Sequence, residues 1–247
     1  MCTTDKPTTR LVALLDSAAE QRTREYWERY MKGTARFRGV PMAGVRTAVR
    51  TVWREQELVS WTTPDLLSLA HRWFAQEMSE DKLAAILLIT EHLGPRLGLG
   101  DVEALGRPFT AGHITDWGIC DWYATKALHG FITGEDTELR PRAEAIAAWS
   151  TASGLWQRRA SVVAFVRLAA QSPDPFDGCT DLLLDTCAAN LVSGDRFAHT
   201  GPAWLLRELS RHHPERVADF VRQHPELSPE ATRMATARLR PGPYRRR

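Results

Sequence analysis

The stretch Ser79 to Leu88, SEDKLAAILL, decides the fold class of this chain of 247 residues. Its first three residues are polar and include two acids, which is typical of the first turn of a helix. The residues that follow are apolar on most sides of a helix, and Gly94-Pro95 ends the pattern. Such a helix is stable only when other elements cover it. We therefore expect stacked helices, with this one buried between its neighbours.

The rest of the chain has the same helical character. No run of alternating polar and apolar residues indicates a strand, and the expected helices follow one another at roughly 18 to 22 residues. Pairs therefore recur about every 40 residues, the period of HEAT-like repeats. We predict an all-α protein, a single curved α-solenoid over residues 1–240, with a basic tail at 241–247. The first expected helix begins at Leu11. The others cover 22–31, 45–59, 63 onward, 79 onward, 101–109, 117–132, 139–152, 155–170, 179–192, 197–210, 214–223 and 229–239.

Composition excludes several classes of protein. Lys and Arg number 32 against 30 Asp and Glu, so a DNA partner would have to be met by local clusters of positive charge. The four cysteines show no zinc-like spacing, and His212-His213 has no companion ligands, so we expect no metal. No signal-peptide pattern and no run of about 18 apolar residues is present. We expect a cytoplasmic protein without a membrane span.

The stretch Thr115 to Tyr123 holds the strongest chemical signal. If Asp116 caps a helix, then Trp117 and Asp121 stand four residues apart on one face of it. An indole beside a carboxylate suits a cationic group. The alternative is that Trp117 and Trp122 pack in the core and Asp121 is a solvated helix residue.

Several basic and aromatic residues are candidates for DNA contact. Arg158 and Arg159 open one helix, Arg207 follows a tryptophan on another, and Arg38 lies in a basic loop at 32–41. Grouped arginines of this kind bind phosphates and position DNA, although each one alone is as well explained by a solvated helix face. Tyr30 either lies near the same site or packs in the core.

Taken together and in this order, these stretches resemble the AlkD-type DNA alkylation-repair glycosylases, a family of HEAT-like repeat proteins. The resemblance covers nearly the whole chain. It begins at Tyr30-Met31-Lys32 and continues through Phe37 to Val40, Asp116 to Asp121 and Leu155 to Ala160. It ends with Trp204 to Glu208 and the helix that follows.

The resemblance implies roles for individual residues. Trp117 and Trp204 match the two family tryptophans that hold the deoxyribose of the damaged nucleotide, and Asp121 matches the catalytic carboxylate. Arg159 matches an arginine that contacts phosphate. The chain departs from the family pattern at Thr200 to Ala203, where the family has Lys-Ala-x-Gly ahead of the tryptophan.

The activity that this resemblance implies is removal of N3- or N7-alkylated purines from double-stranded DNA, by a monomer without a cofactor. The family grips the backbone and leaves the base stacked. None of the matching residues is an evident donor to a purine edge, so we expect excision of both small and bulky adducts. The alternatives are a non-catalytic HEAT-like DNA-binding protein and a protein-interaction solenoid.

Overall fold

In the computed structural model, residues 5–134 and 136–239 are described, and every regular element among them is a helix. This confirms the all-α class. Contacts along the chain define two compact units, Met1–Gly134 and Glu135–Arg247. The single domain over 1–240 and its curvature stay predictions, and the basic tail at 241–247 lies outside the described residues. No described helix is both long enough and apolar enough to cross a bilayer.

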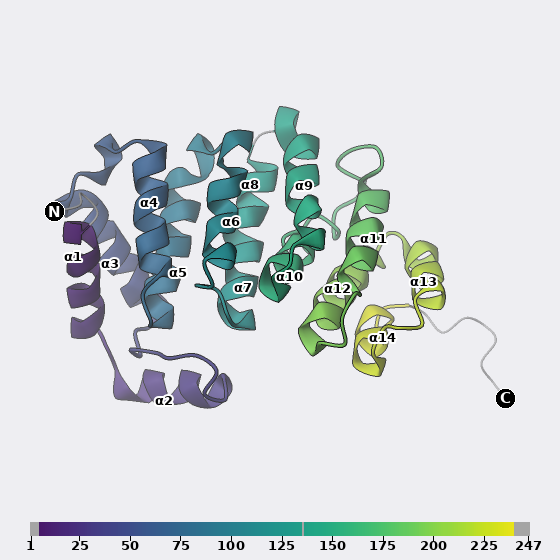
Figure 1. Ribbon diagram of the computed structural model, residues 1–247, viewed down its shortest axis with the longest axis horizontal. Coiled ribbons are helices and arrows are strands. Elements are labelled where there is room, and N and C mark those ends of the chain that lie inside the picture. The colour runs from purple at the N-terminus through teal and green to yellow at the C-terminus, as the bar shows by residue number, and fades with distance from the viewer. Residues whose placement is uncertain (1–4, 135, 240–247) are drawn as a thin grey trace. The chain divides into compact units, whose positions relative to one another are not determined.

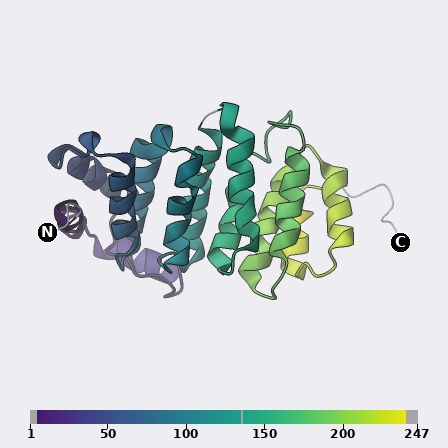
Figure 2. The ribbon, with the colours of Figure 1, turned by 45° about the horizontal axis from the view of Figure 1, so that its top comes forward.

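The first unit consists of helices that pack side by side, with one exception, α2 (Figures 1 and 2). A π-helical turn, Ala124–Leu128, joins α7 to α8 without a break, so that the helix expected at 117–132 is confirmed as one continuous element. The α-helices of this unit are α1 (Asp5–Ser17), α2 (Gln21–Tyr30), α3 (Met42–Glu55), α4 (Thr63–Phe74), α5 (Ser79–Leu88), α6 (Val102–Thr110), α7 (Trp117–Tyr123) and α8 (His129–Thr133).

Helix α5 is the centre of this unit, as its apolar sequence predicted. It contacts α1, α3, α4 and α7. Its residues Ala84 to Leu88 are buried, and so are the polar Ser79, Glu80 and Asp81 of its first turn. Burial of two acids side by side is the feature that the sequence pattern did not indicate, because acids in a first turn are usually solvated.

The buried Glu80 fastens the loop that follows α2. One of its carboxylate oxygens accepts hydrogen bonds from the backbone N–H groups of Gly39 at 2.7 Å and Val40 at 3.0 Å, and the other accepts from Arg38 N–H at 2.9 Å. Neighbouring Asp81 accepts from the Arg38 guanidinium at 2.8 Å. Hydrogen bonds to an ionised group are stronger than neutral ones, about 1.5–3 kcal/mol each, so this acid holds the loop firmly against α5.

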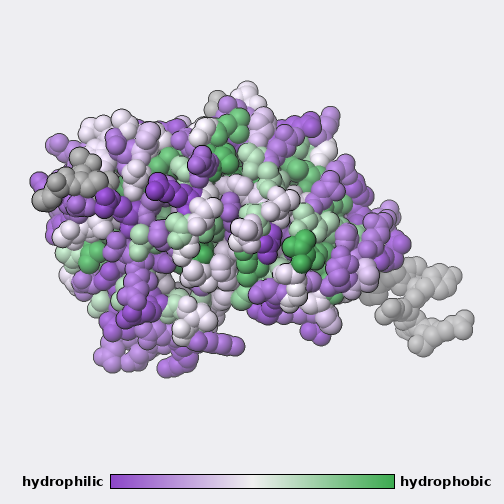
Figure 3. Space-filling view, viewed as in Figure 1, coloured by the Kyte–Doolittle hydropathy of each residue, from purple (hydrophilic) through white to green (hydrophobic). Residues whose placement is uncertain are grey.

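Helix α2 depends on that loop for its position. It lies crosswise at the ends of the upright helices, its outer surface is hydrophilic, and none of its residues is buried (Figures 1 to 3). Glu20 N–H donates to the Gly39 carbonyl at 3.0 Å where α2 begins. Gly39 has φ +94°, and a Cβ there would lie 2.3 Å from the Glu20 oxygen, so only glycine allows this approach.

The second unit is also a set of packed helices. Helix α12 is its centre, because it contacts α10, α11, α13 and α14. A short 3₁₀ turn, Ala148–Thr151, follows α9. The α-helices of this unit are α9 (Leu139–Ala147), α10 (Leu155–Val163), α11 (Cys179–Asn190), α12 (Arg196–Leu209), α13 (Pro214–Gln223) and α14 (Pro229–Ala235).

Several expected helices of the second unit are shorter than predicted: α9 ends at Ala147, α14 ends at Ala235, and α10 shows the largest difference. The apolar pattern indicated a helix over 155–170, but α10 ends at Val163 and residues 164–170 form turns. Here the backbone N–H groups of Phe165 and Val166 bond to the carbonyls three residues back, Val162 and Val163, instead of four. The tighter bonding rotates the chain away from the helix axis, while its apolar side chains stay buried.

A charge cluster joins α12 to the end of the described chain. Glu208 on α12 accepts from the Arg207 guanidinium at 3.0 Å and pairs with Arg211 at 3.2 Å and with Arg238. Although burial alone would raise the pKa of Glu208, hydrogen bonds from Arg238 and Arg207 lower it below its ordinary value of 4.5. Its carboxylate is therefore stabilised by folding.

Removing the Glu80 carboxylate should destabilise the first unit. Glu80→Ala leaves three backbone N–H groups without their acceptor, so we expect a loss of roughly 3 kcal/mol or more in the free energy of unfolding, measured by urea titration. The control is Glu77→Ala, since Glu77 is exposed and pairs with Arg36, which is exposed as well. It should cost less than about 1 kcal/mol. Equal costs for the two variants would contradict the role given to Glu80.

Stability of the second unit should depend on pH through Glu208. Because its pKa is depressed by folding, its stabilisation is complete above 4.5 and is lost as the pH falls through the lower pKa of the folded state. The difference in unfolding free energy between wild type and Glu208→Gln should therefore be constant near neutral pH and shrink below about pH 4. Glu215→Gln, at an exposed acid of α13, serves as control. A Glu208→Gln difference that persists unchanged in acid would contradict this assignment.

Candidate functional site

The first turn of α7 is fixed as the sequence predicted. Asp116 caps the helix, because its Oδ1 accepts a hydrogen bond from the Ile119 N–H at 3.0 Å. With the helix start fixed at Trp117, Trp117 and Asp121 lie one turn apart. Asp116 is buried, whereas Trp117 and Asp121 are both partly exposed. The alternative of a core tryptophan is therefore wrong for Trp117.

The two acids of this turn have different environments. Burial raises the pKa of the Asp116 carboxyl, and the charge of Asp121 raises it further. The N–H groups of Ile119 and Gly118 and the ammonium of Lys82 oppose that rise. Asp116 thus caps the helix, and Asp121 is the acid of this stretch that is partly exposed to solvent.

Tyr30 lies beside this turn and not in the core. Its side chain is 53% exposed, and its ring meets that of Trp117 edge to face with centroids 5.8 Å apart. Met31 also reaches α7, since a Cβ at Gly118 would lie 3.2 Å from Met31 Cε. The crosswise helix α2 therefore contacts the start of α7 through two consecutive residues.

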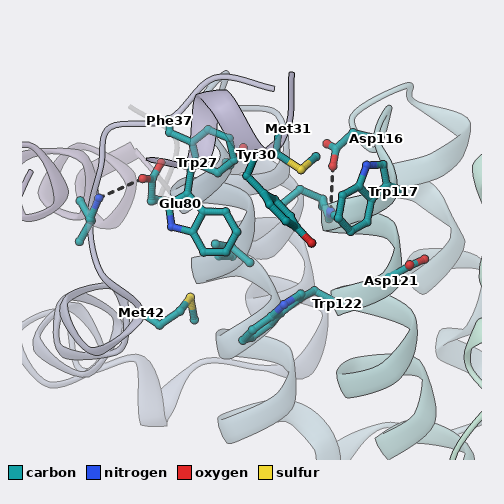
Figure 4. Close-up of a pocket in the computed structure, with 15 residues that line it drawn as sticks. Trp27, Tyr30, Met31, Phe37, Met42, Glu80, Asp116, Trp117, Asp121 and Trp122 are labelled. Atoms are coloured by element: carbon teal, nitrogen blue, oxygen red, sulfur yellow. Dashed lines mark hydrogen bonds between the residues drawn. The ribbon is translucent and has the colours of Figure 1, made fainter. Parts of the chain in front are cut away.

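An aromatic cavity of about 250 Å³ opens between α2, α5 and α7. We use this name for the space lined by the rings of Trp27, Tyr30, Phe37, Trp117 and Trp122. In Figure 4, Trp122 lies across the cavity from Trp27 and Tyr30, while Trp117 and Asp121 lie at one end. Met42 lies toward the other end (Figure 4).

The charged residues that line the aromatic cavity are acids, and Lys126 Nζ lies 5.7 Å from the centroid of the Trp122 ring. Three of the described residues that line it are acids, Glu80, Asp116 and Asp121, and none of them is a lysine, an arginine or a histidine. Glu80 and Asp116 accept hydrogen bonds from backbone N–H groups. Aromatic faces together with carboxylates favour a cationic or electron-poor group and disfavour an anion.

The predicted DNA contact of the first unit, Arg38, has internal partners. Its side chain is 13% exposed, pairs with Asp81 at 2.8 Å and also pairs with Asp16. Its guanidinium holds the loop after α2 in place. A phosphate contact by Arg38 stays a prediction.

The two predicted arginines of α10 also bond within the second unit. Arg158 donates to the backbone carbonyls of Ala152 and Ser153, both at 2.8 Å. Arg159 is only 6% exposed and donates to the Phe197 carbonyl and the Thr200 hydroxyl, both at 3.2 Å. Arg159 therefore holds the first turn of α12 by hydrogen bonds, and a contact of Arg159 with phosphate stays a prediction.

Helix α12 carries the second predicted tryptophan. Trp204 is partly exposed, and Arg207, three residues on, is partly exposed beside Glu208. The helix runs through Pro202 without a break, so the unusual segment Thr200 to Ala203 keeps the helical geometry. Thr200 uses its hydroxyl to accept from Arg159.

No metal site is found in the part of the chain that the structure describes, where no group of three or more His, Cys, Asp or Glu side chains is arranged around a common point. His213 instead bonds to Asp174 at 2.8 Å, and His212 to the Ala170 carbonyl at 3.2 Å. These histidines hold loops of the second unit.

Sequence reasoning did not predict that Trp27, Phe37, Met42 and Trp122 line the candidate site. Trp27, Phe37, Met42 and Trp122 come from three separate segments that only the tertiary fold brings together. The sequence held one signal for Trp27. The ten residues of α2 are too polar to bury a face of the helix, so burial in the core does not explain the large aromatic residues of α2.

Comparisons with known proteins agree with this picture. The family model for DNA alkylation repair enzymes matches residues 11–239, nearly the whole chain. A solved structure, described as a predicted DNA alkylation repair enzyme from Enterococcus faecalis, superposes with a TM-score of 0.74 at 20% sequence identity. The match covers 90% of this chain and 96% of that chain, which shows a shared fold. Among curated proteins, none matches significantly.

The cap of α7 can be tested by two substitutions at Asp116. Asn is as good a helix cap as Asp, so Asp116→Asn should leave the unfolding free energy nearly unchanged, whereas Asp116→Ala should lower it by about 1–2 kcal/mol. Hydrogen exchange of the Ile119 amide, which loses its acceptor only in the Ala variant, should quicken in parallel. Similar losses of stability in both variants would show that the carboxylate charge and not the cap holds this turn.

Proposed function

Because the chain belongs to the DNA alkylation repair enzyme family, we propose that it is a DNA glycosylase that hydrolyses the N-glycosidic bond of N3- or N7-alkylated purines in duplex DNA. The observation that carries the proposal is the first turn of α7, where capped geometry sets Asp121 one turn from Trp117 at the end of an aromatic cavity. An acid beside aromatic faces suits a reaction that develops positive charge.

The proposed reaction needs few catalytic groups. An N3- or N7-alkylated purine is already a cation, so the electron pair of the breaking C1′–N bond neutralises the departing base and no general acid is needed. Positive charge then grows on the sugar, and a water molecule adds to C1′ and loses a proton. A single ionised carboxylate can stabilise that charge and accept the proton. We assign this role to Asp121.

The aromatic side chains would assist in a second way. An indole face beside the sugar offers an attraction to the developing cation worth about 0.5–2 kcal/mol and excludes bulk water. We propose this role for Trp117, with Tyr30 fixing the edge of its ring. Trp204 on α12 is partly exposed, and we propose the same kind of role for its indole.

Binding of double-stranded DNA would rest mainly on its phosphates. Contacts from arginines position a duplex without reading its sequence and make affinity fall with salt. Arg207 and Arg158 are the candidates with partly exposed side chains in the second unit. Arg159 would act by holding the start of α12. No cofactor is required by the reaction proposed.

The non-catalytic alternative differs in one observable. A HEAT-like DNA-binding protein would bind alkylated duplex without releasing a base. The partly exposed Asp121 at the end of the cavity favours the enzyme, since a phosphate-binding surface gains nothing from a carboxylate.

The decisive substitution is Asp121→Asn. It keeps the size of the side chain but removes its charge, so base release from duplex containing 7-methylguanine should fall by at least about a hundredfold, as for loss of a preorganised electrostatic group. Released base is measured by chromatography under single-turnover conditions. Duplex affinity and melting temperature should stay near those of wild type.

The matched control is Asp185→Asn, at an exposed acid of α11 outside the aromatic cavity. It should release base at the wild-type rate. Release by Asp121→Asn within a few-fold of wild type would remove Asp121 from the mechanism, and absence of release by wild type with intact duplex binding would favour the non-catalytic alternative.

A further inference from the structure

The aromatic cavity has a composition that the proposed reaction at Asp121 does not use. Sugar stabilisation needs Trp117 and Asp121, which lie at one end, whereas Trp27, Phe37 and Trp122 extend the lining away from them (Figure 4). Phe37 stacks on Trp27 with centroids 5.9 Å apart and an interplanar angle of 19°. The cavity is therefore built from ordered rings beyond the reacting position.

Two of the rings that line the cavity, those of Trp27 and Tyr30, are exposed to solvent. Trp27 is 36% exposed and Tyr30 53% exposed, and α2 has no buried residue with which to explain them as core. Keeping large aromatic side chains near water costs free energy, about 25 cal/mol for each Å² of apolar surface. Exposed rings that surround a cavity are the mark of a ligand site.

The size of the cavity limits the ligand. A volume of about 250 Å³ lies just below the range of roughly 300–1,000 Å³ found for sites that hold drug-sized molecules. It has room for one fused ring system. Trp122 and Trp27 lie on opposite sides of the cavity, and aromatic side chains of this kind favour a flat group, because rings stack on flat partners.

The charge of the cavity selects among flat groups. The acids Glu80, Asp116 and Asp121 border it, and no lysine, arginine or histidine does so among the described residues that line it. We propose that the aromatic cavity binds one planar, positively charged or electron-poor fused-ring group, held between Trp27 and Trp122. The natural source of the ligand rests on the proposed function, whereas the chemical class of the ligand rests on the cavity alone.

Two sources of such a group exist in an alkylated duplex. One is the alkylated purine itself, turned out of the stack into the cavity. The other is an aromatic ring carried by a bulky adduct, with the purine left in place. Both present the same flat, electron-poor surface to Trp27 and Trp122. If the purine enters the cavity, excision of every lesion depends on these two residues, whereas if the adduct ring enters it, only excision of bulky lesions does.

Binding is tested first without any reaction. The probes are free 7-methylguanosine, in mildly acid buffer where its ring is a cation, and neutral guanosine, each titrated calorimetrically into wild type and Asp121→Asn. We expect saturable binding of the cation by both proteins, about tenfold tighter than guanosine, from a cation–π preference of about 1.4 kcal/mol. No saturable binding, or equal binding of the two probes, would overturn the proposal.

The variants localise the site. Trp27→Ala and Trp122→Ala should each weaken binding of 7-methylguanosine at least about fivefold, and Trp27→Phe, which keeps a flat face, should restore most of it. Trp61→Ala removes a tryptophan of the same unit that does not line the cavity, and it should bind as wild type does. Since Trp27 is partly exposed, Trp27→Ala should fold normally, which its melting temperature verifies. Unchanged binding by both cavity variants would overturn the assignment.

Excision from duplexes identifies the source. Trp27→Ala is compared with wild type on single-turnover release of 7-methylguanine and of a large minor-groove N3-adenine adduct. Slower release of both lesions assigns the cavity to the purine, and slower release of the bulky lesion alone assigns it to the adduct. Unchanged release of both would remove the cavity from the substrate site. Binding of 7-methylguanosine by a wild type that releases no base would refute the glycosylase proposal and leave the cavity confirmed.

Discussion

The buried carboxylate of Glu80 is the interaction on which the candidate site depends. It sits at the start of the central helix α5, where the helix dipole favours an anion, and its oxygens accept from three consecutive backbone N–H groups of the loop after α2. That loop positions Phe37, on which Trp27 stacks. Because α2 buries no residue of its own, its place over the aromatic cavity depends on this loop together with the contacts that Tyr30 and Met31 make with α7.

The three acids near the cavity have different roles. Glu80 and Asp116 satisfy backbone N–H groups, one at a loop and the other at a helix start. Asp121 is partly exposed and lies one helical turn from Trp117. A reaction whose leaving group is already cationic needs one carboxylate and little else, so this division matches the chemistry of alkylpurine removal better than that of ordinary glycoside cleavage, which uses two.

Local features of the fold and site could be predicted from the sequence. The burial of α5 and the cap at Asp116 follow from apolar periodicity and from the spacing of an acid before a helix, which depend on residues within a few positions. The partners of Arg38 and Arg159 could not be predicted, because Asp81 lies 43 residues and Thr200 41 residues away along the chain. The aromatic cavity needed three such separate segments at once. Trp117 and Asp121 were predicted together because one helix turn sets their geometry.

We propose that this protein cuts the bond between sugar and base and leaves the strand intact. The direct measurement uses a labelled duplex with a single 7-methylguanine, incubated with wild-type protein and then divided, one half being heated in alkali before separation by size. A glycosylase should give a full-length strand without alkali and one break at the lesion with it. No alkali-sensitive break, or a break that forms without alkali, would contradict the proposal.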